Sequence, residues 1–417
     1  MRIPLFFILL FSVSLLFAEQ ENCITCHKDI TPGIVNDWQL SQHAKNDVTC
    51  STCHGEKHTN AKDVSYVEIP TPETCANCHE DQVAQYKKGK HAMAWAAMKA
   101  MPTIHHQPIG LTEGMKGCGG CHKLGLKTEE EIKQLKKEGA GFGVASCDAC
   151  HTRHTFSKKE AQQPQACQTC HMGFDHPQWE MYSSSKHGVR ALLKQTGQIH
   201  ESASAPTCQD CHMSEGNHEV RTAWGFLAVR TNGLAPYPGE DEEWWKDRVT
   251  ILQALGVLSP EGKPTARLDV VAKADVARLS KEAFDKERQK MIEICAQCHS
   301  KNFAKAELAK GDQLIREGDK LLAEAIRIVA DLYKDGILKQ QEGQTGNFPD
   351  LLTFHDAPTT IEQTLFEMHL KHRMRLFQGA FHNNPDYSLW YGWSEMVRDL
   401  SEIKEKAAEL RQQHAKK

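Results

Sequence analysis

The chain of 417 residues has no excess of charge of one sign, no long apolar run and little strand pattern. Its formal net charge is −4, whereas a nucleic-acid-binding protein would usually show a basic excess. An apolar content of 40% with so small a net charge argues against a disordered chain. The apolar runs are too short for a protein that crosses the membrane many times. These absences indicate a globular protein with no nucleic-acid partner.

The first segment has the pattern of an export signal. Arg2 precedes an apolar run over residues 4–17, and Ala18 and two polar residues follow it. A positive start, a short apolar stretch and a small residue before a polar one predict a signal peptide over 1–18, cleaved near Ala18. A retained membrane anchor is the alternative, but the run is short for a span and no positive charge follows it. We therefore expect a periplasmic or secreted protein.

Two residue types are unusually abundant, with 16 cysteines and 23 histidines. The cysteines fall without remainder into eight C-x-x-C-H motifs. The cysteine pairs are Cys23/Cys26, Cys50/Cys53, Cys75/Cys78, Cys118/Cys121, Cys147/Cys150, Cys167/Cys170, Cys208/Cys211 and Cys295/Cys298. The histidines that complete the motifs are His27, His54, His79, His122, His151, His171, His212 and His299.

The repeated motif predicts covalent attachment of eight c-type haems. At this spacing each thiol can form a thioether with one haem vinyl group, and the adjacent imidazole becomes the proximal ligand of the iron. A disulfide scaffold would not require a histidine after every pair. Zinc sites would place the histidine at variable distances, and thioredoxin-like pairs occur singly near a βαβ unit.

Seven of the eight motifs lie within residues 23–212, which leaves too little chain for a conventional layered core. We therefore expect a mainly α, multihaem cytochrome c fold in which the haems form the core, and which unfolds without them. The pattern divides the chain into an octahaem-binding catalytic region over 19–300 and a helical region over 301–417. Aromatic residues between the seventh and eighth motifs indicate that this stretch is packed too.

The last third of the chain predicts a helical bundle of three helices. The first covers 305–341, the second begins near Thr360 with a Thr360/Gln363 capping box, and the third follows Pro385. The predicted buried faces are Leu314, Gly318, Leu321, Ala325, Ile328 and Leu332; Ile361, Leu365, Met368 and His372; and Leu389, Trp393, Met396, Leu400, Ile403, Ala407 and Leu410. The third face has heptad spacing, typical either of packing within the chain or of a subunit interface.

Fifteen histidines lie outside the motifs, and some of them must serve as distal ligands. An iron with two imidazoles carries electrons, whereas an iron with an open position can bind a small molecule. The candidates for distal ligands are His43, His58, His91, His154, His187, His218 and His382. The assignments of His105, His106, His200, His355, His369, His372 and His414 stay open, His414 being most consistent with a solvated residue.

Two of the candidates follow a motif too closely to reach the far side of the same iron. His58 comes four residues after His54, and His154 comes three residues after His151. We expect each to bind a neighbouring haem, which would place the haems in close pairs along a continuous electron path.

An adjacent Asp175–His176 pair follows the sixth motif. One interpretation makes His176 a further axial ligand that Asp175 orients. The other makes the two residues an acid/base pair over an open iron, because reactions of nitrogen or oxygen substrates need proton donors. An aspartate beside a histidine can hold its tautomer and raise its basicity.

Several stretches around these motifs resemble the octahaem hydroxylamine oxidoreductase family. They include Gly117–His122, Cys147–Phe156, Cys170–Tyr182 with Ser185–Gly188, Cys211–His218 and Phe381–Tyr387. The resemblance covers most of the mature chain. It implies a mostly helical trimer with catalysis at the fourth haem, which Cys118, Cys121 and His122 carry here. It further implies that this iron lacks a distal protein ligand and that Asp175 and His176 line its pocket.

The resemblance leaves the direction of the reaction open. Oxidising members link the catalytic porphyrin to a tyrosine from a neighbouring subunit, and Tyr333, Tyr387 and Tyr391 are the tyrosines after His299. None of them is assigned that role, and the chain is similar to the branch without the link. We therefore favour reduction of nitrite or hydroxylamine to ammonium, with electrons from a redox partner protein or a quinol-linked cytochrome. The alternatives are hydroxylamine oxidation to nitric oxide or nitrite, and a non-catalytic electron conduit in which His176 or His106 closes the last iron.

Overall fold

The computed structural model describes residues 22–100, 117–137, 146–230, 240–340, 344, 346–353 and 357–416. In this part of the chain the secondary structure is helical, and strand pairing is limited to two isolated bridges. The predicted mainly α class is therefore confirmed. None of the described helices combines the length and the apolar character that a membrane span needs. The predicted signal peptide over residues 1–18 lies outside the described residues.

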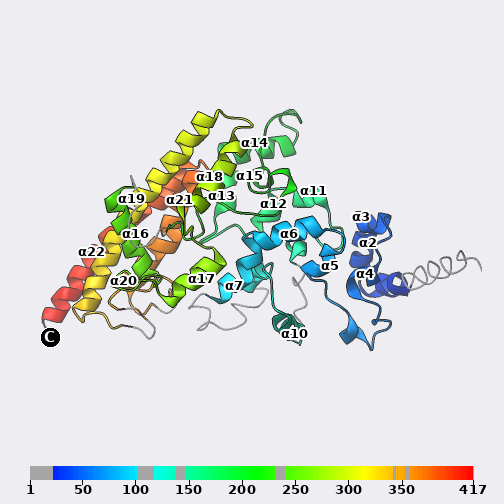
Figure 1. Cartoon of the computed structure of the whole chain (residues 1–417), viewed down its shortest axis with the longest axis horizontal. Coiled ribbons are helices and arrows are strands. Elements are labelled where there is room, and N and C mark those ends of the chain that lie inside the picture. Colours follow the sequence, from blue (N-terminus) through cyan, green and yellow to red (C-terminus); the bar gives the residue numbers. More distant parts are fainter. Residues whose placement is uncertain are drawn as a thin grey trace, which may run out of the picture.

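The motif region, residues 22–212, consists of short helices joined by loops (Figure 1). None of α2 to α15 exceeds ten residues, and isolated helices of that length are marginal in water. They are α2 Pro32–Leu40, α3 Gln42–Lys45, α4 Cys50–His54, α5 Pro72–Ala76, α6 Glu80–Lys88, α7 Ala94–Lys99, α9 Gly119–His122, α10 Glu129–Lys137, α11 Lys158–Ala161, α12 Gln165–Gln168, α13 Gln178–Ser183, α14 Lys186–Gln195 and α15 Cys208–His212. Other contacts must therefore hold them in place.

The rest of the chain forms longer helices and a continuous apolar core. Its elements are α16 Glu242–Ala254, α17 Ala266–Ala274, α18 Lys281–Cys295, α19 Lys301–Lys334, α20 Thr360–Glu367, the π-helix η7 Met368–Arg373, α21 Met374–Phe381, the π-helix η8 Asp386–Trp393 and α22 Ser394–Ala415. We call α16, α19, α20, η7, α21 and α22 the C-terminal bundle. Figure 1 shows α19 and α22 side by side at one end of the molecule, with α2 to α4 at the opposite end.

The helix expected over 305–341 is α19, but it ends at Lys334 rather than at residue 341. Gly336 has a φ of +69°, and the amides of Ile337 and Leu338 return to the carbonyl of Leu332, which closes the helix end. The buried face is centred about one residue away from the predicted one. Its centre is Ile315, Leu322, Ile326 and Val329, each at most 2% exposed. The predicted face is correct at the buried Gly318, Ala325 and Leu332 and wrong at Leu314, which is 36% exposed, while Leu321 and Ile328 are partly buried. Neighbours α16, α21 and α22 pack on that face.

The second expected helix is α20, and its predicted face is correct. Ile361, Leu365, Met368 and His372 are all buried. The predicted Thr360/Gln363 capping box is wrong, because the N-cap is Thr359. The Thr359 hydroxyl donates to the Glu362 carboxylate at 2.5 Å, and the Gln363 side chain donates to the Ala357 carbonyl instead.

The third expected helix begins as η8 and continues as α22. Four of its heptad positions lie in the core of the bundle: Met396, Leu400, Ile403 and Ala407. This part of the heptad pattern therefore serves packing within the chain. The first two positions, Leu389 and Trp393, stay 45% and 38% exposed. Gly392 permits the close crossing with α21, since a Cβ there would lie 2.6 Å from the Leu376 backbone.

Both sides of residue 300 contribute to the main core. Apolar residues between 227 and 279 pack in one cluster with residues of α19, α20 and α22. The division into regions 19–300 and 301–417 remains a prediction.

Candidate functional site

Each C-x-x-C-H motif forms one turn of helix, which explains why the spacing suits a haem. The amide of the motif histidine donates to the carbonyl of the first cysteine, for example from His122 to Cys118 at 3.0 Å and from His299 to Cys295 at 2.9 Å. Residues at positions i, i+3 and i+4 share one helix face. Both thiols and the imidazole therefore lie on one side of the turn.

Cysteines of different motifs lie close together in space, and none of the sixteen forms a disulfide. The thiols of Cys121 and Cys170 contact each other, as do those of Cys167 and Cys208. In the same way, a cysteine of one motif lies near a cysteine of another for motifs one and two, two and three, three and five, five and six, and seven and eight. The arrangement is a chain of motifs in which the fourth branches from the sixth.

Seven motif histidines each face a histidine from outside the motifs, and one of them, His171, also has His176 at 6.1 Å. The pairs are His27 with His58, His54 with His154, His79 with His43, His151 with His218, His171 with His91, His212 with His382, and His299 with His187. The ring centroids are 6.1 to 6.5 Å apart. Two imidazoles bound to one iron through metal–nitrogen bonds of about 2 Å have centroids roughly 6 Å apart. The spacing thus leaves room for one iron between the rings.

The pairs include every predicted distal histidine. His58 lies opposite the histidine of the adjacent first motif and His154 opposite that of the second motif, so neither faces the histidine of its own motif. Their role as ligands remains a prediction, for which this geometry is what bis-imidazole coordination requires.

Hydrogen bonds hold several rings through Nδ1 and leave Nε2 for a metal. His122 binds the Ala94 carbonyl at 2.9 Å, His54 the Glu68 carbonyl at 3.0 Å, and His382 the Gln378 carbonyl at 2.7 Å. Such outer partners fix the tautomer and the orientation of a ligating histidine. Burial also lowers the pKa of His171 to about 3 and that of His212 to about 4, which favours the neutral imidazole that binds iron.

The space between the paired rings is one continuous cavity of about 3520 Å³. An ordinary small-molecule site has roughly 300–1,000 Å³. All eight motif histidines, the seven histidines that face them and every motif cysteine except Cys298 line the cavity. The donor set and the size of the cavity both fit several covalently attached haems.

The fourth motif faces His176, the second residue of the Asp175–His176 pair. The centroids of His122 and His176 are 6.3 Å apart with nearly perpendicular rings, and His176 is also 6.1 Å from His171. The spacing from His122 falls within the 6.1 to 6.5 Å range of the seven other pairs. His176 differs from most of their distal rings because its Nδ1 donates to the Asp175 carboxylate of the preceding residue, at 2.8 Å.

Asp175 is held in its ionised form. Burial raises the pKa of its carboxyl, but the hydrogen bond and the charge from His176 outweigh that effect, so the pKa lies below its ordinary value. Phe226 stacks on the His176 ring at 4.8 Å and 16°. The pair is therefore fixed on two sides, by a carboxylate and by an aromatic ring.

Residues that the sequence did not single out fix the position of Phe226. The buried guanidinium of Arg373 donates to the carbonyls of Leu227 and Ala228 at 2.9 Å, and it pairs with the fully buried Asp319 at 2.6 Å. Arg373 thus connects the C-terminal bundle to the segment behind His176. The sequence signal that could have identified this contact is that Asp319 and Arg373, which have opposite charges, each lie within an apolar helical face.

The histidines left open fall into three groups. His200 and His414 are exposed. His369 and His372 are buried in the bundle, where His372 donates to Asp399 at 2.5 Å and neither ring nitrogen of His369 has a partner in the described structure. None of these four lines the cavity. His105, His106 and His355 lie outside the described residues.

The three tyrosines after His299 lie in two places. Tyr333 is buried in the bundle, where its hydroxyl donates to Glu362. Tyr387 and Tyr391 stack on each other in η8 at 5.1 Å, and Tyr391 is half-exposed.

Comparison with known proteins gives matches along most of the chain. The family model of seven-times multi-haem CxxCH cytochromes matches residues 46–253 and 265–349, and a model of cytochrome c554 and c-prime matches residues 12–55. A probable nitrite reductase–hydroxylamine oxidoreductase fusion protein of Kuenenia stuttgartiensis is 27% identical over 94% of this chain and 52% of its own. The multiheme cytochrome MtrA of Shewanella baltica is 29% identical over 48% of this chain and 58% of its own. The chain thus spans about half the length of these relatives.

Solved structures share the fold over nearly the whole chain. A reducing HAO-like protein complex of Kuenenia stuttgartiensis has a TM-score of 0.70 at 24% identity, covering 97% of this chain and 87% of that one. A hypothetical multiheme protein has a TM-score of 0.65 at 20% identity, covering 96% and 99%. Since the first family model covers most of the chain and its motifs gather around one cavity, this protein belongs to the multihaem CxxCH cytochromes, which carry covalently bound c-type haems, and its fold is similar to that of the reducing HAO-like protein.

Proposed function

We propose that this cytochrome carries eight haems and reduces nitrite or hydroxylamine to ammonium at the haem of the fourth motif. The observation that carries the proposal is the Asp175–His176 pair, which faces His122 across the cavity. A relative described as a nitrite reductase–hydroxylamine oxidoreductase fusion supports the substrate class. A structural neighbour described as reducing supports the direction.

The pair has the chemistry that such a reduction needs. A haem held by Cys118, Cys121 and His122 would supply the electrons for this reduction when bound. Conversion of nitrite to ammonium consumes six electrons and eight protons and releases two water molecules, so a proton donor must stand beside the substrate. Asp175 accepts a hydrogen bond from Nδ1–H of His176 and so stabilises the imidazolium, from which Nε2 can deliver a proton to the substrate. Phe226 keeps the ring in place.

The test is ammonium formation by the full-length, haem-loaded protein with a low-potential electron donor and either substrate. We expect Asp175→Asn to lower the rate by about 10²-fold, because the carboxylate no longer supports the imidazolium. His176→Ala should lower it at least as much. His200→Ala, an exposed histidine away from the cavity, is the matched control and should leave the rate unchanged. Equal rates in all variants would contradict the proposal.

A second candidate function is a conduit in which His176 closes the fourth iron. The 6.3 Å spacing of His122 and His176 favours it, because it falls within the range of the seven other pairs. The partial match to MtrA also supports it. His176→Ala separates the two functions. If the protein is an enzyme, the wild type already shows a high-spin ferric signal that responds to hydroxylamine, and His176→Ala is inactive. If it is a conduit, that signal appears only in His176→Ala.

The proposal also covers the location of the protein, its electron donor and its oligomeric state. We propose export to the periplasm, a cytochrome as electron donor, and a trimer. Exposed apolar residues on η8 and the start of α22 support an assembly: Leu389, Trp390, Tyr391, Trp393 and Val397. The mass of the mature chain tests both cleavage near Ala18 and the count of eight haems, and light scattering tests the trimer. A chain covalently joined to a second chain through porphyrin would favour oxidation instead.

A further inference from the structure

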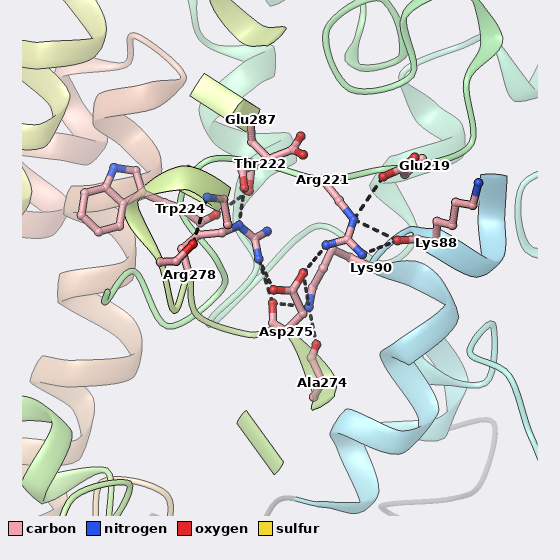
Figure 2. A network of polar contacts seen from close by, with 12 residues as sticks. Lys88, Lys90, Glu219, Arg221, Thr222, Trp224, Ala274, Asp275, Arg278 and Glu287 are labelled. Carbon is pink, nitrogen blue, oxygen red and sulfur yellow. Dashed lines mark hydrogen bonds and ion pairs between the residues drawn. The ribbon is translucent and has the colours of Figure 1, made fainter. Parts of the chain in front are cut away.

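Two segments that carry candidate axial histidines, His91 and His218, line the cavity and lie side by side. Figure 2 shows Lys88 and Lys90 of the first segment close to Glu219 and Arg221 of the second. The amide of Lys90 donates to the Val220 carbonyl at 2.9 Å, and the amide of His218 donates to the Gln85 side chain at 3.0 Å. His91 faces the sixth motif and His218 faces the fifth. Whatever fixes these segments therefore fixes one side of two neighbouring haem sites.

Three cations converge on one carboxylate beside these segments. Asp275 follows α17 in a left-handed conformation, with a φ of +50°. Arg221 Nη1 donates to its Oδ2 at 2.6 Å, Arg278 Nη1 donates to its Oδ1, and Lys90 Nζ lies 3.8 Å from its Oδ2. Lys90 also donates to the carbonyls of Ala274 and Asp275. Figure 2 shows the three side chains reaching Asp275 from different segments.

The charges of this cluster do not balance within the protein. Besides Asp275, Glu219 is its only carboxylate among the described ion pairs, 3.4 Å from Arg221. Glu287, which Figure 2 shows above Thr222, is paired with Lys290 at 3.0 Å. Three cations thus face two carboxylates at the edge of a cavity where burial makes unbalanced charge costly.

Arg278 has the one donor of this cluster that lacks a described partner. Its side chain is 2% exposed, its Nε donates to the Thr222 carbonyl at 2.9 Å, and its Nη2 is buried without a hydrogen bond within the described residues. Arg278 lines the cavity. Arg267 and Arg288 line it too, but they are paired with Asp350 at 2.9 Å and with Asp312 at 2.6 Å. A buried guanidinium with a free N–H requires an acceptor.

We propose that Arg278 is a carboxylate-binding residue that holds a haem propionate of the fifth or sixth motif. A guanidinium presents its N–H groups in a planar fork that matches a carboxylate, and the cluster supplies the balancing positive charge. Arg278 lines the cavity that the haems would fill, so their propionates are carboxylates that could reach it and that the chain itself does not supply. The inference depends on haem attachment and is independent of the catalytic proposal.

One consequence is that Arg278 influences the reduction potential of that haem. A cation held beside a haem stabilises the added electron, so its loss disfavours reduction. Lys90 and Arg221 of the same cluster also hold the segments that carry His91 and His218 together. The cluster would therefore fix both the haem propionate and the histidines that face the haems.

The test compares Arg278→Gln and Arg278→Lys in the full-length, haem-loaded protein. Resonance Raman spectra report the propionate bending band, and potentiometric titration followed by EPR reports each low-spin haem. We expect the propionate band to move in both variants, because both lose the fork. The equilibrium constant for reducing one haem should fall at least tenfold in Arg278→Gln, which is 59 mV for one electron, and less in Arg278→Lys, which keeps the charge.

Arg267→Gln is the matched control, since its guanidinium is already paired with Asp350, and it should leave the propionate band unchanged. If Arg278→Gln does not fold, the conservative Arg278→Lys decides through the same band. A propionate band that is unmoved in Arg278→Lys would overturn the proposal. Acetate added to the wild-type protein should change neither band nor potential, and a response to acetate would identify a free anion as the occupant instead.

Discussion

The C-terminal bundle and the motif region bury very different amounts of apolar surface. In the bundle, Leu322, Ile326 and Val329 of α19 are fully buried and belong to one core with α16, α20 and α22. The apolar cluster described in the motif region consists of Trp95, Met98 and Leu135, with two partly buried neighbours. What the motif region has instead is a cavity lined by cysteines and histidines.

The contrast teaches that one chain can be stabilised in two ways. Helices of 22 and 34 residues with a continuous apolar face fold by excluding water. Helical turns of four or five residues cannot do so, and they require covalent bonds and metal ligands from a cofactor. Each prediction below tests this contrast, from the largest expected effect to the smallest.

The largest effect should come from preventing haem attachment. In cells that lack cytochrome c maturation, we expect the motif region to stay unfolded while the C-terminal bundle retains helical structure. Limited proteolysis with mass spectrometry should then give a protected fragment that begins after residue 240. If the motif region resists the protease without haem, the two regions do not differ in what stabilises them.

The next effect concerns the buried ion pair that links the bundle to the segment behind His176. Arg373→Ala leaves the fully buried Asp319 without its partner and should lower the free energy of unfolding by about 3–5 kcal/mol. Denaturant titration followed by far-UV circular dichroism measures it. Arg398→Ala removes an exposed arginine from the same bundle and should cost no more than about 1 kcal/mol. Equal losses would show that the buried pair has no special role.

A pH effect should also arise in the bundle. Burial and, after it, the charge of Arg373 lower the pKa of His369 to about 3. His372 on the same π-helix is paired with Asp399. The folded state therefore binds a proton less readily than the unfolded state, whose pKa is about 6.5. Stability is full above that pH and is lost as the pH falls towards the folded pKa, by about 2 kcal/mol at pH 5.

Unfolding titrations at pH 7 and pH 5 measure this loss. His369→Leu should remove about 2 kcal/mol of the difference between the two conditions. The exposed His414 offers a matched control, and His414→Leu should retain the full difference. An unchanged difference in His369→Leu would assign the acid sensitivity to other groups.

The smallest effect is expected at the surface between α19 and α22. Lys404 pairs with Glu324 at 2.7 Å, and both side chains are about half exposed. Solvent screens such a pair, so Lys404→Ala should change the free energy of unfolding by less than about 1 kcal/mol. A larger loss in the same denaturant titration would mean that polar contacts, and not only the apolar core, hold the bundle.

Sequence reasoning succeeded where the signal is local. The C-x-x-C-H turns, the face of α20 and the four heptad positions of α22 follow from residues three or four apart, which a helix places together. It failed at the end of α19 and at the N-cap of α20, where a glycine and a neighbouring threonine decided the outcome. Candidate distal histidines were identified as a set, but the partner of each could not be predicted. His154 lies opposite His54, a hundred positions earlier in the chain.

The amino-acid sequence by itself determined the motifs for haem attachment, the histidines available as ligands, and the Asp175–His176 pair next to the sixth motif. Those properties depend on covalent structure and on spacing within one helical turn. Only the tertiary structure decided which imidazole faces which motif, that the fourth motif branches from the sixth, and that Arg278 and Arg373 are buried at the cavity wall and in the bundle. Such contacts join residues far apart in the chain, and their free energy depends on the burial that folding creates.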